Sequence, residues 1–182
     1  MGADRAPRAV ALIRDFVNSL ELEADGETDD WADPGSLTAW LAGRAMAPDA
    51  PLDADDLERA RSVRKALRAM LLANHDAKPV DEAALRTINR AARTTPLALR
   101  FDQSGARLEP TSSGIDAAIG RVLAAVHAAM ADGTWHRLKA CRRHSCRWAF
   151  YDESRNRSRN WCSMEVCGNR EKAETYRERH SH

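Results

Sequence analysis

The stretch CRRHSCRWAFYDESRNRSRNWCSMEVCGNR, residues 141–170, decides the fold of the last quarter of the chain, because all four cysteines lie within it. Cys141, Cys146, Cys162 and Cys167 follow the spacing C-x4-C-x15-C-x4-C. Zinc prefers four tetrahedral ligands, and four thiolates close its coordination shell. Two local cysteine pairs joined by a linker of this length can wrap around one ion. The spacing therefore predicts one structural Zn²⁺ per chain.

Disulfides and free thiols are the alternatives to zinc. We expect a cytoplasmic protein, where cysteines stay reduced. The start of the chain lacks an apolar signal-peptide core, and no apolar run approaches the roughly 20 residues of a membrane span. The rival ligands are His136, His144, His180 and His182, and only His144 lies between two paired cysteines. Four thiolates already complete the shell, and they leave no open position for catalysis.

The charge is unevenly distributed along the 182 residues. Residues 135–182 hold 12 Lys/Arg and 6 Asp/Glu, a net of +6, whereas residues 1–134 hold 16 and 21, a net of −5. Four thiolates and one Zn²⁺ sum to about −2, so the charge of the zinc-bound tail falls to about +4. A basic tail on an acidic body favours contact with a polyanion, and DNA is the expected partner.

Basic side chains lie between and after the cysteine pairs. Residues 147–151 predict a strand, residues 152–160 predict a turn, and a helix is expected after Cys167. The candidate DNA-contacting residues are Arg155, Arg157, Arg159, Arg170 and Lys172. Asn and Ser between the loop arginines are typical of phosphate-contacting loops. The alternatives are a solvated loop, and a helix whose charges pair with each other, as Arg170 could with Glu174.

Residues 1–134 predict a helical body. Apolar residues repeat at helical spacing from Val10 to Leu20, and Asp33, Asp53 and Asp81 stand where N-caps of further helices are expected. Residues 97–102 alternate apolar and polar side chains and predict a short hairpin with residues 107–109. In the helix that Asp81 caps, Leu85 is expected to face inward. The last helix of the body is expected to face Met130 inward and to end at Gly133.

The fold class that follows is mainly α. It comprises a helical N-terminal domain with a short β-hairpin, residues 1–134, and a small zinc-finger module ending in a helix, residues 135–182. We expect apolar helix faces to hold the body and the ion to hold the module, so that chelation unfolds the chain from about residue 140 onward and leaves the body intact.

A body joined to a basic metal module suggests a sensor for a small molecule. The candidate pocket residues are Arg14, Asn18, Trp31 and Trp40. Alternatively, Asn18 makes a structural hydrogen bond and the tryptophans belong to the core. The chain carries no G-x-S-x-G, H-E-x-x-H, Walker or G-x-G-x-x-G motif, and nothing else in it indicates an enzyme.

The C-terminal residues resemble the CGNR zinc finger. The resemblance rests on Cys-Gly-Asn-Arg at 167–170, Ser-Arg-Asn-Trp-Cys-Ser-Met at 158–164 and Phe-Tyr-Asp-Glu-Ser at 150–154. That finger closes a family of bacterial proteins whose N-terminal part is the ABATE domain. Asp15-Phe16-Val17-Asn18-Ser19 and Ala39-Trp40-Leu41 are similar to motifs of that domain, so the resemblance spans nearly the whole chain.

The resemblance implies zinc on the four cysteines and a role as a stress-related transcription regulator. Asn160, Glu174 and Thr175 stand at places where the family more often has arginine, which predicts modest DNA affinity, since affinity follows the number of neutralised phosphates. Sequence specificity would need a homodimer presenting two fingers. The alternative function is a zinc-stabilised protein-interaction module that does not bind DNA.

Overall fold

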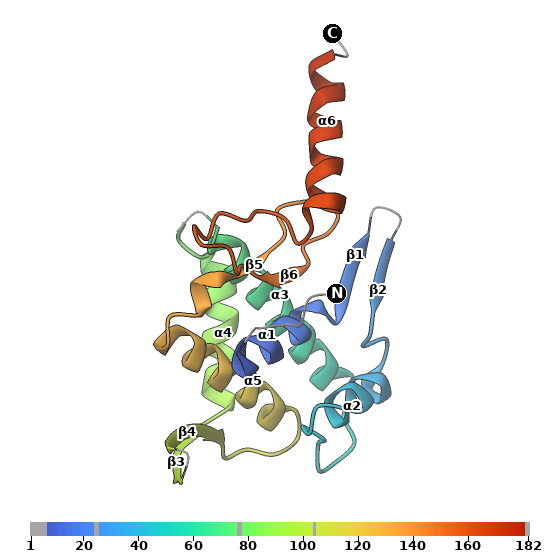
Figure 1. Cartoon of the computed structure of the whole chain (residues 1–182). Coiled ribbons are helices and arrows are strands. Elements are labelled where there is room, and N and C mark those ends of the chain that lie inside the picture. Colours follow the sequence, from blue (N-terminus) through green and yellow to red (C-terminus); the bar gives the residue numbers. More distant parts are fainter. Residues whose placement is uncertain (1–6, 24–25, 76–77, 104, 181–182) are drawn as a thin grey trace.

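Helices dominate the protein, whose computed structural model describes residues 7–23, 26–75, 78–103 and 105–180. A body of packed helices carries the cysteine-containing module at one end, and a last helix projects from that module (Figure 1). The body helices are α1 (Arg8–Asn18), α2 (Pro34–Ala42), α3 (Ala54–Ala73), α4 (Glu82–Thr94) and α5 (Gly114–Ala131). The module contains a 3₁₀ turn η1 (Trp135–Arg137), a π-helical turn η2 (Met164–Gly168) and helix α6 (Asn169–His180).

The strands form antiparallel hairpins of two strands each. They pair β1 (Leu20–Glu23) with β2 (Gly26–Asp29), β3 (Leu97–Asp102) with β4 (Gly105–Pro110), and β5 (Leu138–Ala140) with β6 (Ala149–Tyr151). The predicted fold class, mainly helical with a zinc module that ends in a helix, is confirmed. The hairpin at 97–110 is the predicted one, whereas sequence reasoning missed β1 and β2.

Side-chain caps start the body helices where the sequence places them. Asp33 accepts a hydrogen bond from the Ser36 N–H at 2.7 Å, and Asp53 and Asp81 cap α3 and α4 in the same way. A cap of this kind satisfies one of the backbone donors that a helix start leaves unpaired. Gly133 ends the last body helix with φ of 77°, a left-handed conformation that costs glycine little.

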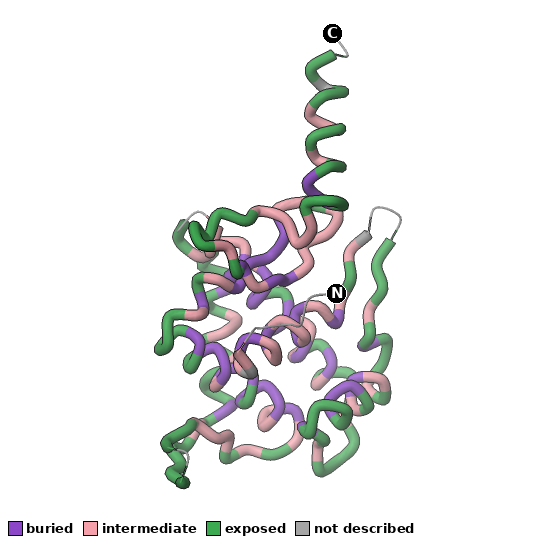
Figure 2. The backbone as a smooth tube through the Cα atoms, in the orientation of Figure 1, coloured by how far each residue is buried: buried purple, intermediate pink, exposed green. Residues whose placement is uncertain are grey.

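The core lies where α1, α3 and α5 meet (Figure 2). Helix α1 buries Val10, Ile13, Phe16 and Val17 completely or nearly so, which confirms its predicted apolar face. Helix α5 is long and apolar enough to cross a membrane by length and composition, but half of that stretch is buried inside the protein. Its apolar character is therefore accounted for by the core that it fills.

Some expected orientations are wrong. Leu85 and Met130 were predicted to face inward but are 39% and 46% exposed. Leu85 lies beside the buried Ala84 on the flank of α4, and Met130 lies in the last turn of α5, where the helix leaves the core. Leu20 leaves the helical face and starts β1. The hairpin that follows is held by buried arginines of α3: Arg64 binds both carboxylate oxygens of Asp29 at 2.7 Å, and Arg68 donates to the carbonyls of Val17 and Leu20.

Candidate functional site

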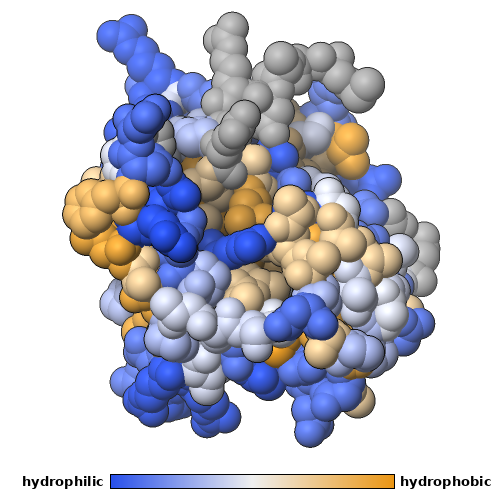
Figure 3. Space-filling view, turned by 90° about the horizontal axis from the view of Figure 1, so that it is seen from below, coloured by the Kyte–Doolittle hydropathy of each residue, from blue (hydrophilic) through white to orange (hydrophobic). Residues whose placement is uncertain are grey.

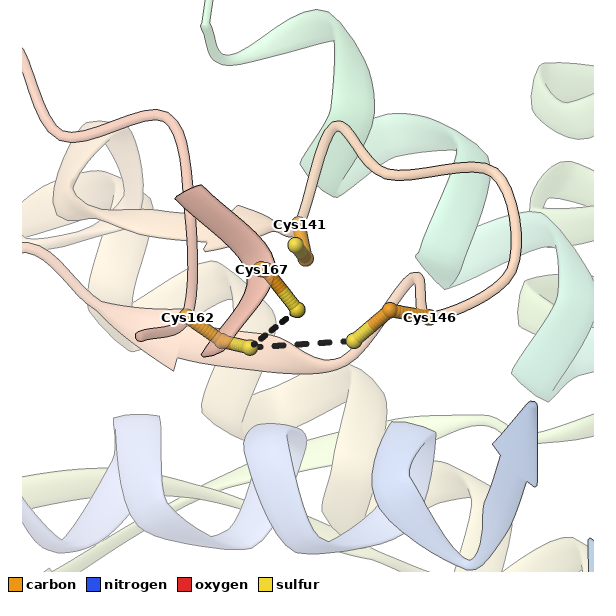
Figure 4. A group of neighbouring side chains, drawn as sticks. All are labelled: Cys141, Cys146, Cys162 and Cys167. Atoms are coloured by element: carbon orange, nitrogen blue, oxygen red, sulfur yellow. Dashed lines mark hydrogen bonds between the residues drawn. The ribbon is translucent and has the colours of Figure 1, made fainter. Parts of the chain in front are cut away.

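The four cysteine sulfurs meet in one cluster (Figure 4). All four Sγ atoms lie within 4.8 Å of one another, with Cys146–Cys162 at 3.7 Å and Cys162–Cys167 at 3.6 Å. Zinc–sulfur bonds of about 2.3 Å in a tetrahedron place neighbouring sulfurs about 3.8 Å apart, whereas a disulfide needs about 2.0 Å. The cluster therefore fits one structural Zn²⁺ and excludes disulfides, as the spacing predicts.

The first cysteine pair is positioned by a tight turn after β5. The Cys141 N–H donates to the Trp148 carbonyl at 2.8 Å, which continues the β5–β6 ladder by one step. The Cys146 N–H donates to the Arg143 carbonyl at 3.1 Å, and Arg147 closes the turn with φ of 51°. His144 is exposed and its ring contacts Arg147, so it lies outside the sulfur cluster.

The second pair is positioned by the turn η2. Ser163 caps η2 by accepting from the Val166 N–H, and the turn leads directly into α6. Gly168, the glycine of the Cys-Gly-Asn-Arg motif, lies against the side chains of Met164 and Trp161, so a side chain there would require at least Met164 to move. An added Cβ would overlap the side chain of Met164 and lie 3.1 Å from Cδ1 of Trp161. The motif glycine thus lets the backbone approach the aromatic ring beside the metal site.

The crowded thiols shift one another's pKa values. Hydrogen bonds from Cys146 and Cys162 lower the pKa of the Cys141 thiol. The same contact with Cys141 raises the pKa of Cys146 and of Cys162. One thiolate in the cluster therefore opposes the formation of the next. A divalent cation among the sulfurs removes that opposition, because coordination deprotonates thiols.

A buried ion pair supports the strand side of the module. Lys139 and Asp152 have side chains that are 3% and 0% exposed and lie 2.8 Å apart. Asp152 also accepts from the N–H and hydroxyl of Ser154 and from the Arg159 N–H. Burial raises the pKa of Asp152, but the hydrogen bonds from Lys139 and Ser154 outweigh it and lower the pKa to about 2. These contacts fix the start of the 152–160 loop.

Two asparagines join the helical body to the module. The Asn18 amide donates to the Ala149 carbonyl at 2.9 Å and accepts from the Ala149 N–H at 2.7 Å. Asn74 donates to the carbonyls of Trp135 and Leu138, both at 2.9 Å. The His75 ring lies 2.6 Å from the Ala140 carbonyl, which can only accept, so Nε2 donates. Both helix ends thus bind the backbone of the module directly.

Residues on both sides of position 134 share one core. Trp135, Leu138, Ala140 and Ala149 belong to the same buried cluster as the apolar faces of α1, α3 and α5. A smaller cluster surrounds the cysteines and contains Phe150. The division into domains at residue 134 stays a prediction, but the expectation of a body that packs without the module does not match this shared core.

A cavity of about 610 Å³ lies between α1 and the module. Its walls include Arg14 and Asn18, two of the predicted pocket residues, together with Arg44, Tyr151 and Cys162. Arg14 forms an ion pair with Asp15 at 3.0 Å. The cavity therefore contains charged groups of both signs, aromatic surface and the edge of the metal site.

Trp31 and Trp40, the other predicted pocket residues, do not line this cavity. They are 0% and 8% exposed and pack with Phe16 in edge-to-face contacts, with ring centroids 4.9 to 6.0 Å apart. Arg44 covers the outer face of Trp40 at 3.7 Å from the ring centroid. Both tryptophans are therefore core residues, as the alternative to a pocket role predicted, because their rings fill the space between α1, α2 and α3.

The predicted DNA-contacting side chains differ in their surroundings. Arg155, Arg157, Arg170 and Lys172 are exposed. Arg159 is exposed as a residue, but its guanidinium donates to the Trp161 and Cys162 carbonyls and lies 5.1 Å from the Phe150 ring centroid. Arg159 is therefore engaged with the second cysteine pair.

An ion pair missed by sequence reasoning sets the base of α6. Arg143 binds both carboxylate oxygens of Glu174, at 3.1 and 2.6 Å. Glu174 is one of the places where arginine was expected, so the departure has a structural role within the module. The sequence shows a positive charge at Arg143, three residues before Cys146, and a carboxylate at Glu174 on the following helix. Because the two residues are 31 positions apart, the sequence alone did not indicate that they pair.

Two family models match the chain in sequence order. Residues 10–133 match the ABATE family, described as "Putative stress-induced transcription regulator". Residues 137–180 match the CGNR zinc finger. A search of curated proteins finds no match. The two matched segments meet at the η1 turn, next to the Asn74 contacts, and the second contains all four clustered cysteines.

Proposed function

The chain belongs to the ABATE family and carries a CGNR zinc finger, and we propose that it is a transcription regulator in which an effector-binding cavity controls DNA contact by the zinc module. The observation that carries the proposal is the cavity between α1 and the module, whose wall includes the ligand Cys162. The proposal assigns no catalytic residue and places the chain in the cytoplasm, where thiols stay reduced.

The effector is a small molecule of mixed polarity. The cavity has the size of ordinary ligand pockets, which are roughly 300–1,000 Å³. Arg14 and Arg44 offer guanidinium groups, Asp30 and Glu153 offer carboxylates, and Tyr151 offers an aromatic ring. A ligand that joins an anionic group to a hydrogen-bond donor and an apolar part matches this lining.

Coupling to the module follows from the position of Asn18. This residue lines the cavity and also binds both backbone groups of Ala149 in β6. A ligand that contacts Asn18 changes the same hydrogen bonds that hold the module against α1. Such a ligand has a differential interaction with two arrangements of the module, which is the requirement for an allosteric effect.

DNA contact is assigned to the exposed cationic residues Arg155, Arg157, Arg170 and Lys172. Each neutralised phosphate contributes about 0.9 to the slope of log affinity against log salt, so four contacts predict a slope near −4. Little sequence preference is expected, because phosphate contacts alone do not read bases.

Fluorescence anisotropy with labelled duplexes at low salt tests the DNA assignment. The triple substitution of Arg155, Arg157 and Lys172 by Ala should weaken binding on every sequence and reduce the salt slope by about 3. The matched control replaces Arg86, Arg90 and Arg93 of α4 by Ala, which removes the same charge from exposed positions of the body. Equal loss in both triple variants would mean that only net charge matters, and the assignment would fail.

The alternative, a protein-interaction module, has one observation in its favour. Met164, Val166 and Tyr176 of the module are 48%, 47% and 63% exposed, so it presents apolar side chains beside its charges. If the wild-type protein shows no DNA binding at micromolar concentration and low salt, this alternative becomes the better proposal. Replacing Val166 and Tyr176 by Ser should then abolish partner capture while leaving the zinc content unchanged.

A further inference from the structure

One edge of strand β3 has no partner strand within the described residues. The Thr111 N–H donates to the Pro96 carbonyl at 3.0 Å, which marks a hydrogen-bonded pair at the base of the β3–β4 ladder. Hydrogen-bonded and non-hydrogen-bonded pairs alternate along an antiparallel ladder. The backbone groups of Leu97, Leu99 and Phe101 therefore point away from β4, toward the open edge.

The same three residues put apolar side chains on one face of the hairpin. Leu97 packs at its base, where an added Cβ on Gly120 of α5 would lie 3.5 Å from Leu97 and 2.9 Å from Pro110. Strand β4 packs along α5, and β3 lies outside it. Leu99 and Phe101 are consequently 59% and 74% exposed. Figure 3, seen from the end that carries the hairpin, shows orange apolar surface on this side of the protein.

A groove continues this apolar surface. It has a volume of about 670 Å³ and lies between the hairpin and α5, with Leu99 and Leu108 on one side and Ala124, Ala128 and Ala131 on the other. Exposed apolar surface next to an open strand edge is a template for pairing with another chain. An added strand would point side chains toward the hairpin face that lines this groove, and the groove has open space for them.

We propose that β3 pairs antiparallel with β3 of a second copy of this chain, which forms a four-stranded sheet across a homodimer. With the two-fold axis at Leu99, Leu97 of each copy faces Phe101 of the other, and Leu99 faces its own counterpart. All the outward backbone groups then find partners, in about six hydrogen bonds, two for each facing pair. The strand is self-complementary because its apolar residues are arranged symmetrically about Leu99.

Charge and strand length disfavour the two registers shifted toward the end of β3. An axis at Arg100 would place two guanidinium groups opposite each other, which is unfavourable. An axis at Phe101 would pair Leu99 with Gln103, outside the strand. The charges on the other face are already paired within the hairpin, Arg100 with Glu109 at 2.7 Å and Arg107 with Asp102. Joining two copies about Leu99 therefore leaves no new charge unpaired.

The position of the hairpin makes this interface compatible with the zinc module. In Figure 1 the β3–β4 hairpin and α6 lie at opposite ends of the protein. The interface therefore covers neither the cysteine cluster nor the cavity beside Asn18. The dimer does not depend on the proposed function, and its test uses no nucleic acid.

Sedimentation velocity over a range of concentrations, with zinc-loaded full-length protein, tests the dimer. The double substitution Leu99→Lys and Phe101→Lys should raise the dimer dissociation constant by roughly a hundredfold or more, because each copy would bury two ammonium groups. The matched control is Leu85→Lys with Tyr176→Lys, which adds the same charge at exposed apolar positions elsewhere and should leave dimerisation unchanged.

A second variant separates strand pairing from apolar contact. Leu99→Pro removes an N–H that the hairpin itself does not use, so each copy keeps its own ladder while the central pair of the interface is lost. Circular dichroism checks that the fold persists. A dimer that resists the lysine pair, a dimer that resists Leu99→Pro, or a wild-type monomer at every soluble concentration would each overturn the proposal.

Discussion

Replacing Asn18 by Ala tests the contact between the helical body and the zinc module. The substitution removes two hydrogen bonds to a residue 131 positions away. Each such bond contributes about 1 kcal/mol net, so the loss is about 2 kcal/mol if water from the adjacent cavity reaches the freed groups. Ala149 is fully buried. If water stays out, desolvation of its N–H and carbonyl adds about 1–3 kcal/mol.

Urea unfolding at fixed free zinc is the suitable assay, because any ligand that binds the native state shifts apparent stability. Thermal unfolding under the same conditions gives a second readout, since about 2 kcal/mol corresponds to a fall in Tm of roughly 4–8 °C for a chain of this length. The control is Asn89→Ala on the exposed surface of α4, which should change stability by less than about 0.5 kcal/mol.

Asn18→Asp refines the test. The introduced carboxylate keeps the acceptor for the Ala149 N–H but faces the Ala149 carbonyl without a proton to donate. Its folded-state pKa should therefore rise above its unfolded value, so stability returns below the unfolded pKa and is lost as pH rises through the folded pKa. An Ala variant as stable as the wild type, together with an Asp variant indifferent to pH, would refute this account of Asn18.

The remaining predictions concern the metal and two ion pairs. Elemental analysis should give one zinc per chain, and chelation should raise hydrogen exchange in the body as well as the module, because Trp135 shares the body's core. Asp152→Asn should cost about 3–5 kcal/mol in urea unfolding by leaving the buried Lys139 ammonium without its carboxylate. Replacing both residues by apolar ones should recover only part of this cost, because the Ser154 and Arg159 N–H groups would lose their acceptor. Burial raises the pKa of Asp29, but hydrogen bonds from Arg64 outweigh it, so stability should fall below about pH 4, and Asp29→Asn should flatten that part of the pH profile.

Features set by neighbouring residues were predictable from the sequence. The caps Asp33, Asp53 and Asp81 act within three residues of themselves, and the cysteine spacing constrains its own loops. The alternation of apolar and polar residues at 97–102 predicts the hairpin at 97–110. The structure confirms all of these, because the energy that decides each one is local.

Contacts between distant residues were not predictable. Asn18 was proposed as a pocket residue or a structural one, and it lines the cavity while also binding Ala149. The sequence analysis did not single out Arg64 and Arg68, yet both are buried and hold β1 and β2. A charged residue reveals such a role only when its partner is known, and these partners lie 35 to 51 positions away.

The Asn18 amide also has a consequence for solubility. The Cys141–Trp148 hydrogen bond places the backbone groups of Ala149 on the side of β6 away from β5, so they form an open strand edge that the Asn18 side chain occupies. An amide used in this way prevents another polypeptide from docking there. Losing it leaves an unpaired strand edge beside a cavity, and unpaired strand edges favour aggregation. An Asn18→Ala preparation should therefore precipitate on concentration while it is still folded.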